Sequence, residues 1–220
     1  YLSAANQLQV RIVSGYDVVQ PSGQKVEFRE SRLVTLVRPS KMRIDLERDD
    51  GGKSVFLFDG STISVFDPNR KVLAAASRPG DIDGAMKYFV KDLKMRIPLA
   101  MMFTAGFPGE VQDRVKSAQV VQRATLFDVP CIQVAAQADS VDFQAWIPER
   151  GAPFPRRIVI TYRGEPGEPQ FWADLSDWNL APNPPELLFA LAVPEGTERV
   201  PFLAEIANVS GAPTGQGGRN

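Results

Sequence analysis

Histidine is absent from this chain of 220 residues, and cysteine occurs once. Without histidine there is no Ser-His-Asp or Cys-His catalytic pair, no histidine-based metal site, and no side chain with an ordinary pKa near neutrality. The single thiol, Cys131, can form neither an intrachain disulfide nor a cysteine-cluster zinc site, and its neighbours Pro130 and Ile132 favour a small core residue over a reactive thiol. The sequence therefore predicts no metal, no cofactor and no histidine- or cysteine-dependent catalysis.

An excess of charge of either sign is also missing, because 25 Lys and Arg stand against 26 Asp and Glu. The chain has no global field that would attract nucleic acid or an anionic membrane. Long hydrophobic runs are missing as well: the longest, Leu187–Val193, is far shorter than the roughly 20 residues that a membrane-spanning helix needs. Phosphate-loop, dinucleotide-binding and nucleophile-elbow motifs do not occur. We therefore expect a protein that is not an enzyme, with no nucleic-acid partner and no transmembrane segment.

Alternation of apolar and polar residues with a period of two dominates what is present. Met42, Ile44 and Leu46, for example, share one face while charged residues occupy the other, as in a strand with one buried face. Turn signals such as Asp59-Gly60 separate consecutive segments closely enough for hairpins, which favours an antiparallel meander. About eleven strands are predicted in this way: 8–19, 25–37, 42–48, 54–58, 62–66, 71–76, 117–127, 130–138, 141–147, 156–163 and 169–178.

The second of these strands contains an irregularity. Val26 and Phe28 begin on one face, but the alternation changes phase around Glu30 to Arg32. A shift of one residue moves every following side chain to the other face. The phase change therefore predicts a β-bulge or a sharp bend at this point.

One helical insertion interrupts the strands. Asp81 can cap a helix over Asp81–Met95, in which apolar residues recur at helical spacing, and Pro98 suits the first turn of a second, almost entirely apolar helix, Pro98–Phe103. Four of the five methionines fall in this insertion: Met86, Met95, Met101 and Met102. Flexible methionines suit a surface that adapts to an apolar ligand, although they can equally fill a core.

A large antiparallel sheet with one apolar face must curl, pair with a second sheet or be filled from within. We expect residues 1–206 to form one such domain, and the polar, glycine-rich residues 207–220 to be disordered. A hydrophobic guest between sheet and insertion is one way to fill the interior. The residues predicted to approach it are Met86, Phe89, Leu93, Leu99, Met102 and Phe103 from the helices and Ile44, Phe56, Phe58, Phe66 and Phe143 from the sheet.

The three tryptophans, Trp146, Trp172 and Trp178, all fall in the last predicted strands, on the face opposite to the apolar one. They could form an exposed aromatic patch for a sugar, a lipid headgroup or a protein partner. They could equally form cross-strand pairs that a neighbouring segment covers, and we favour this second interpretation.

Three segments resemble the LolA-like superfamily of periplasmic lipoprotein carriers. Arg38–Ile44 is similar to its RP-x-x-hydrophobic-R motif at the start of a strand, Phe58–Pro68 to a hairpin with a DG and a DP, and Phe189 with Val193–Gly196 to a closing F-x-x-P-x-G segment. Within the superfamily, residues 1–203 most resemble a family of predicted periplasmic proteins of unknown function. That closer match depends on the Ile97-Pro98-Leu99 helix and on the hairpin from Ile160 to Trp178.

The resemblance implies a mainly β fold: a single curved antiparallel half-barrel of about eleven strands, with helices across the concave face. It also implies an apolar cavity suited to acyl chains, a periplasmic location and a signal peptide that has been removed. The matching motifs are structural turns, so they specify fold better than activity. Arg32 and Arg43 are both candidates for a gating arginine, and no motif decides between them.

Two functions follow as expectations. The first is a non-enzymatic periplasmic binding protein that holds a lipid, an acyl chain or a lipoprotein in an apolar cavity. The second is an envelope regulatory or scaffolding domain that binds another protein through an exposed surface, with Trp146, Trp172 and Trp178 as the contact. The two differ in whether a tunnel remains once the side chains are in place.

Overall fold

The computed structural model describes residues 2–92 and 97–203. Within these residues, twelve strands form one sheet in the order β12-β6-β5-β4-β3-β2-β1-β11-β10-β9-β8-β7. The strands are β1 (Gln7–Val19), β2 (Lys25–Val37), β3 (Lys41–Arg48), β4 (Lys53–Phe58), β5 (Thr62–Asp67), β6 (Val72–Ser77), β7 (Ser117–Leu126), β8 (Val129–Gln137), β9 (Val141–Pro148), β10 (Arg157–Tyr162), β11 (Gln170–Asn179) and β12 (Glu198–Arg199). The helical elements are η1 (Leu2–Ala4), α1 (Ile82–Lys87), η2 (Tyr88–Asp92), η3 (Ala100–Phe103), α2 (Phe107–Arg114) and η4 (Glu186–Phe189).

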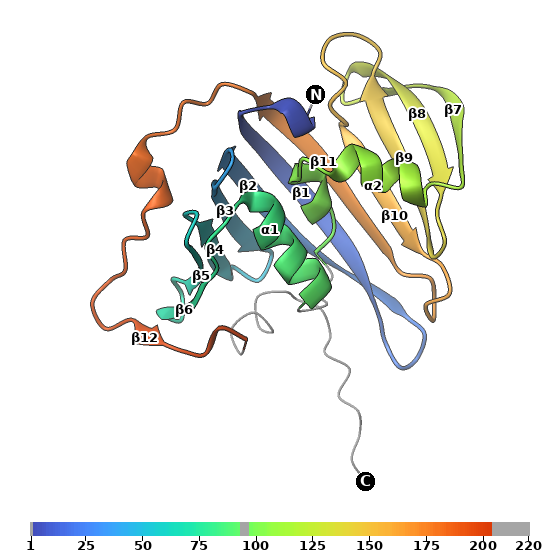
Figure 1. Ribbon diagram of the computed structural model, residues 1–220. Helices are drawn as coiled ribbons and strands as arrows, with labels where there is room; N and C mark the ends of the chain where they lie inside the picture. The colour runs from blue at the N-terminus through green and yellow to red at the C-terminus, as the bar shows by residue number, and fades with distance from the viewer. Residues whose placement is uncertain (1, 93–96, 204–220) are drawn as a thin grey trace.

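The predicted fold is confirmed: the sheet is open, curved and almost wholly antiparallel, with the helical insertion in front of it (Figure 1). Strands β1 to β11 pair antiparallel, and each lies close to its predicted bounds. The short β12 was not predicted, and it pairs parallel with β6. None of the described helices is long and apolar enough to cross a membrane.

One face of the sheet, here called the inner face, carries the core. On β1 it presents Leu8, Val10 and Ile12, which are at most 1% exposed. Residues directly opposite each other in antiparallel strands point to the same side, so the register extends this face across the sheet. Through β2 and β3 it continues from Val10 to Val34 and Ile44. The opposite side of the sheet is called the outer face.

The helical insertion packs on the inner face of β1 to β5. Met86, Phe89 and Met102 are buried in the same cluster as the inner-face residues of these strands. The rings of Phe89 and Phe56 meet edge to face with their centroids 5.4 Å apart, which joins η2 to β4. This half of the interior is therefore filled by the chain itself.

The helices of the insertion differ in detail from the prediction. Asp81 caps α1 as expected, because its side chain accepts a hydrogen bond of 2.7 Å from the backbone N–H of Gly84. The α-helix ends at Lys87, however, and continues as the π-helical η2, while residues 93–96 lie outside the described residues. The second predicted helix is the shorter 3-10 helix η3, since Leu99 has a left-handed backbone with φ 66° and cannot continue a right-handed helix.

Helix α2 was not predicted at all. Pro108 could have indicated the start of this helix, because it stands in the first turn, where no backbone hydrogen bond is lost with the missing N–H of proline. None of its residues is buried, so the helix lacks the strong apolar periodicity by which the other helical segment was recognised.

The predicted bulge at Glu30 to Arg32 is wrong, because the register of β2 with both β1 and β3 is unbroken there. The side chains of Glu30 and Arg32 point inward, on the same face of β2 as Val34 and Leu36. A phase change is expected only if the charged side chains of Glu30 and Arg32 face solvent, and they do not. They are tolerated inside because the Arg32 guanidinium and the Glu30 carboxylate form an ion pair.

Arg38, at the end of β2, holds the insertion against the sheet. Its Nε donates a hydrogen bond of 2.9 Å to the carbonyl of Ala5, and its Nη2 donates one of 2.8 Å to the carbonyl of Phe103. Its Nη1 lies 3.8 Å from the carboxylate of Asp83, which accepts hydrogen bonds from the backbone N–H of Ala105. A single half-buried guanidinium thus connects β2 with η1, α1 and η3.

Part of the outer face is covered by the segment that follows β11. This segment passes around the sheet to β12, as Figure 1 shows. Its helix η4 contacts β3, where Nη1 of Arg43 donates a hydrogen bond of 3.1 Å to the carbonyl of Leu188 and Lys41 lies over the ring of Phe189. The predicted tail, residues 207–220, lies outside the described residues.

Candidate functional site

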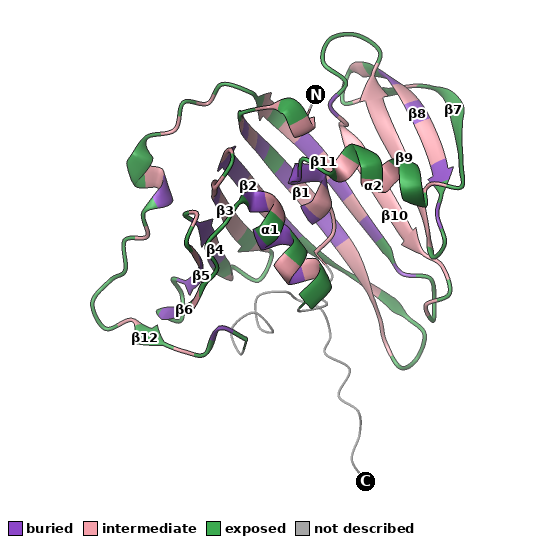
Figure 2. Ribbon diagram, viewed as in Figure 1, coloured by how far each residue is buried: buried purple, intermediate pink, exposed green. Residues whose placement is uncertain are grey.

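The two halves of the inner face differ in how far they are covered. Over β3 to β5, Met42, Phe58 and Ile63 are at most 1% exposed beneath the helical insertion. Over β8 to β10, most inner-face residues are only half buried, although Ala136 is buried; β9 and β10 are pink throughout in Figure 2. Although α2 crosses in front of these strands in the view of Figure 1, it does not seal them from solvent. An apolar surface therefore remains accessible on one half of the concave side.

This accessible surface, here called the open face, is built by the register of β8, β9 and β10. Ile158 stands opposite Ala145, and Ile160 stands opposite Phe143. The same two rows continue to β8 and then to the edge strand β7, where Val120 is 68% exposed. The half-buried apolar residues of the open face are Ile132, Val134, Phe143, Ala145, Ile147, Ile158, Ile160 and Tyr162.

Most residues predicted to meet a guest are brought together on the inner side. Five of them are buried in the closed half: Phe58, Met86, Phe89, Met102 and Phe103. Three are half buried and pack against that cluster: Ile44, Phe56 and Leu99. Phe143 belongs to the open face, and Leu93 lies outside the described residues.

Phe66 is the exception, because the register places it on the outer face. It stands opposite Val55 in β4 and Leu73 in β6, whereas Ile63 and Val65 of the same strand point inward. Phe66 is nevertheless only 6% exposed. An outer-face aromatic residue can be buried here because this side of the sheet also has a covered region, which the alternation alone does not reveal.

The residues predicted to meet a guest include Phe143 of β9 but no residue of β10, although Ile158, Ile160 and Tyr162 of β10 belong to the same surface. The signal was the alternation itself: three large apolar residues at a period of two, on a strand next to that of Phe143, indicate a continuous apolar patch.

Polar side chains also occur on the inner face, on β1, β2 and β4. Ser14 is fully buried, Glu30 is 8% exposed and Ser54 is 3% exposed. Close by, burial and the negative charge of Glu30 raise the pKa of the Tyr16 hydroxyl, so it stays protonated at neutral pH.

The three tryptophans are half buried. The indole of Trp172 lies between the guanidinium groups of Arg29 and Arg157, at 5.2 and 5.1 Å from the ring centroid, and its Nε1 donates a hydrogen bond of 3.0 Å to Glu27. Trp146 is half buried on the same outer face, opposite Arg157.

Trp178 does not share that face. The register between β1 and β11 shifts near Asp177, whose φ is 54°, and this turns Trp178 towards the core cluster. Its ring stacks on Phe154 with the centroids 4.9 Å apart. The three tryptophans therefore do not form one aromatic surface.

No cluster of three or more carboxylate, histidine or cysteine side chains that could hold a metal occurs among the described residues. Cys131 is buried, and burial raises the pKa of its thiol. A thiol in this state is a poor nucleophile. The site is thus characterised by apolar surface and not by reactive groups.

The chain thus forms a curved, open, almost wholly antiparallel sheet with helices across its inner face. The chain belongs to the DUF2092 family, described as predicted periplasmic protein, which matches it over residues 1–203. The protein is accordingly periplasmic, and the family resemblance seen in the sequence is confirmed. No curated protein matches the chain.

Several solved structures share this fold. An uncharacterized conserved protein from Thermus thermophilus is 8% identical, with a TM-score of 0.50 over 90% of this chain and 92% of that one. The lipoprotein LppX of Mycobacterium tuberculosis is 14% identical, with a TM-score of 0.45 over 80% and 87% of the two chains. A LolA superfamily protein from Nitrosomonas europaea is 14% identical, with a TM-score of 0.43 over 86% and 91%. At such low identity the likeness concerns the fold alone.

Proposed function

We propose that this periplasmic protein is a non-enzymatic binding protein that holds a lipid, an acyl chain or the lipid part of a lipoprotein against its inner face. The observation that carries the proposal is the open face: large aliphatic and aromatic side chains that are only partly buried, at the edge of the buried core cluster. Contiguous exposed apolar surface is unfavourable in water and commonly marks a binding site.

The chemistry of the open face fits a hydrocarbon chain. Phe143, Ile158 and Ile160 offer apolar surface, so affinity comes from burial, at about 25 cal/mol per Å² removed from water before the costs of binding. The half-buried Leu99 would approach the chain from the insertion. The buried residues Met86, Phe89, Met102 and Phe103 would support the insertion behind it, and Phe66 is left out because it faces the other way.

The proposal is tested by titrating the delipidated protein with a fluorescent fatty acid and comparing two variants of β10. Ile160→Asn places an amide on the open face, whereas Val159→Asn places the same group on the outer face of the same strand. We expect Ile160→Asn to weaken binding roughly tenfold, which corresponds to about 1.4 kcal/mol of lost apolar contact. Val159→Asn should change the affinity less than twofold.

Far-ultraviolet circular dichroism and thermal denaturation check that both variants are folded. Saturable binding by the parent chain that only Ile160→Asn weakens supports the proposal. Absence of saturable binding by the parent chain, or equal effects of the two variants, would contradict it. The envelope scaffolding function would then become the better account.

A further inference from the structure

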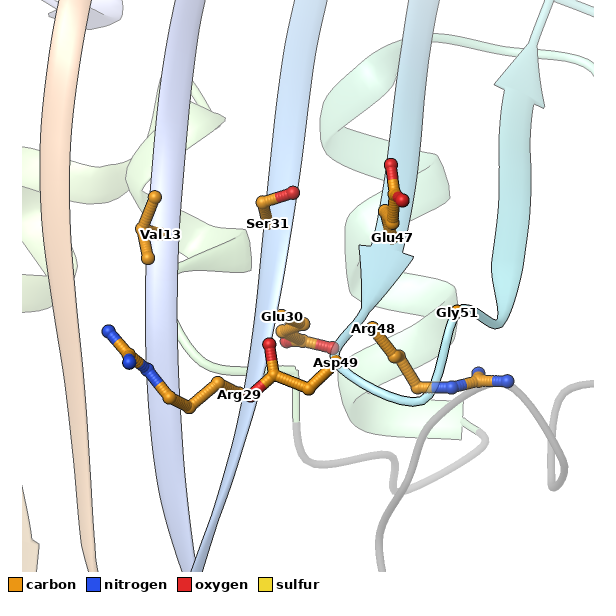
Figure 3. Close-up of a pocket in the computed structure, with 8 residues that line it drawn as sticks. All are labelled: Val13, Arg29, Glu30, Ser31, Glu47, Arg48, Asp49 and Gly51. Carbon is orange, nitrogen blue, oxygen red and sulfur yellow. The ribbon is translucent and has the colours of Figure 1, made fainter.

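Two surface features outside the open face could receive another molecule. One is a pocket of about 430 Å³, with Val13, Ser31 and Glu47 of the outer face in its lining (Figure 3). The same lining carries the guanidinium groups of Arg29 and Arg48, so its charges favour neither an anion nor a cation. The other feature is the free edge of β7, which is more specific.

The strand β7 ends the sheet, and its outward edge pairs with no strand that the structure describes. All residues from Ser117 to Arg123 are exposed, and among them Val120 and Val121 are 68% and 50% exposed. The backbone N–H and C=O groups along such an edge are available for pairing with another strand. At the opposite end of the sheet, β12 covers part of the edge of β6. The molecule thus protects one edge and leaves the other open.

A bulge in β7 restricts how a second copy of this strand can pair with it. The pairing of β7 with β8 skips Val121, which lies between the opposed residues Val120 and Gln122. The inner face of β7 therefore passes from even-numbered residues such as Ala118 to odd-numbered ones such as Arg123. Residues directly opposite each other in antiparallel strands share a face. In two paired copies, each inner residue before the bulge must thus lie opposite an inner residue after it.

One register meets this condition and also sets similar side chains against each other; we call it the glutamine register. It places Gln119 on the outer face opposite Gln122 of the second copy, and Val120 opposite Val121 of the second copy. The exposed valines of the two strands then cover one another, which removes apolar surface from water. A regular strand would have to skip Val121 a second time, whereas a second β7 matches it residue for residue. A second copy is therefore the better partner.

The outer face of β7 to β9 already carries a ladder of amide side chains. Nε2 of Gln122 donates a hydrogen bond of 2.9 Å to Oε1 of Gln133, and Nε2 of Gln133 donates one of 2.8 Å to Oε1 of Gln144. Gln133 is only 8% exposed, so the ladder is built into the sheet. In the glutamine register, the amide of Gln119 from the second copy would continue the ladder by donating to Oε1 of Gln122. Ladders of this kind stabilise stacked strands.

The cations of β7 are compatible with this pairing. Lys116 forms an ion pair with Asp139, and Nε of Arg123 lies 3.5 Å from the carboxylate of Glu149. In the glutamine register both cations lie opposite uncharged residues of the second copy. Shifting the register in one direction sets Lys116 against Arg123, and like charges directly opposite each other are destabilising. Shifting it in the other direction sets Val120 against Arg123 and separates the valines.

We propose that β7 pairs antiparallel with β7 of a second copy of this chain, in the glutamine register, to form a symmetric dimer with one continuous sheet. The two strands are then related by a two-fold axis, and each contact occurs twice. Because this axis is perpendicular to the sheet, the open faces of the two copies lie on the same side. The inference goes beyond the proposed function and does not depend on it, since no lipid takes part in the pairing.

Sedimentation velocity of the parent chain at increasing concentration tests the dimer. Pairing of single strands gives a small interface, so we expect a reversible dimer with a dissociation constant of roughly 10 μM. Val120→Glu should raise this constant about tenfold or more, because it sets a carboxylate against Val121 of the second copy. Val193→Glu makes the same change at an exposed valine outside β7 and should leave the constant within about twofold.

Cysteine cross-linking tests the register. A mixture of the Gln119→Cys and Gln122→Cys proteins should form a disulfide-linked dimer, because the two positions are directly opposite in the glutamine register. Either protein alone should remain unlinked, since equivalent positions of the two copies are then too far apart for a disulfide. The native Cys131 is buried and does not interfere. A mixture of Gln119→Cys and Ala124→Cys is the control for a shifted register.

The outcomes decide both parts of the inference. A parent chain that stays monomeric up to roughly ten times the expected dissociation constant would overturn it, as would a dimer that Val120→Glu leaves intact. Stronger cross-linking of Gln119→Cys with Ala124→Cys than with Gln122→Cys would overturn the glutamine register. Binding of the fluorescent fatty acid by a strictly monomeric chain would overturn the dimer and leave the proposed function standing.

Discussion

At the scale of single residues, Gly15 allows the outer face of β1 to accept the indole of Trp172. A Cβ atom at Gly15 would lie 2.6 Å from Cε2 and Nε1 of that ring, closer than real contacts allow. The indole cannot move away freely, because Arg29, Arg157 and Glu27 hold it. The glycine is therefore required by a close approach and not by its backbone conformation.

Gly15→Ala should lower the free energy of unfolding by about 1–3 kcal/mol, the usual cost of overpacking, and should change tryptophan fluorescence. Urea denaturation followed by fluorescence measures both. Gly109→Ala in α2 is the control, because no atom lies within 4 Å of a Cβ there, and helix propensity predicts a small gain. A Gly15→Ala protein as stable as the parent, with an unchanged spectrum, would refute this description of Trp172.

Asp59 determines the turn between β4 and β5. Its carboxylate accepts hydrogen bonds of 2.8 Å from the backbone N–H groups of Ser61 and Thr62 and from the Ser61 hydroxyl. Burial alone would raise the pKa of this carboxyl, but the hydrogen bonds outweigh burial and hold the pKa below its ordinary value. The ionised form is thus favoured in the folded chain.

A lowered pKa in the folded state gives a stability contribution that is complete above the ordinary carboxyl pKa of roughly 4 and is lost as the pH falls through the folded value. Asp59→Ala should therefore be less stable than the parent at pH 7, by about 1 kcal/mol for the lost hydrogen bonds. The difference should shrink at pH 3 and below. Urea denaturation across this range measures it, and a difference that stays constant down to pH 2 would disprove the assignment.

Single residues also mark the limit of what the sequence could predict. Alternation placed Ile44 and Phe143 on the inner face correctly, because they follow the rule that apolar residues face the core. The rule failed at Glu30, a charged residue on the apolar inner face, and at Phe66, an aromatic residue on the outer face. The ion pair with Arg32 explains why Glu30 can lie inside. The burial of Phe66 on the outer face depends on parts of the fold that the alternation within one strand does not reveal.

At the scale of elements, the attachment of the helical insertion depends on Arg38. Arg38→Gln should lower the free energy of unfolding by roughly 3 kcal/mol, since it removes charged hydrogen bonds to the carbonyls of Ala5 and Phe103 and leaves Asp83 without its partner. Amide hydrogen exchange in η3 should rise at the same time. Urea denaturation and exchange measured by mass spectrometry check the two effects.

Arg11→Gln serves as control, because the exposed ion pair of Arg11 with Asp177 contributes at most about 1 kcal/mol. A loss of stability in Arg38→Gln no larger than in Arg11→Gln would contradict the role given to Arg38. Faster exchange throughout the sheet, instead of in the insertion, would point to a general loss of stability and would not support a specific attachment.

Strands were easier to predict than helices, for a physical reason. Each strand carries its own signal, since hairpin turns and alternation are local. The insertion depends on packing: Leu99 takes a left-handed conformation and η3 stays short in a setting created by the sheet. The two-residue β12 is stabilised only by its neighbour β6, so nothing local in Glu198–Arg199 could announce it.

At the scale of the whole molecule, the sheet is asymmetric. One end is filled by α1, η2 and η3, and the other presents the half-buried open face of β8 to β10 (Figure 2). A domain that needed only a stable core would have no reason to leave Phe143 and Ile160 accessible. The asymmetry is the basis of the proposed binding function, and it separates a buried half from the half that we propose meets the ligand.

This separation is tested most directly by a methyl NMR titration of the isoleucine-labelled protein with palmitate. The account predicts saturable shifts at the methyl groups of Ile158 and Ile160 on the open face. Ile63 and Ile82, which are fully buried in the closed half, serve as internal controls and should not shift. Shifts confined to Ile63 and Ile82, or no saturable shift at any isoleucine, would contradict the assignment of the open face as the ligand-binding surface.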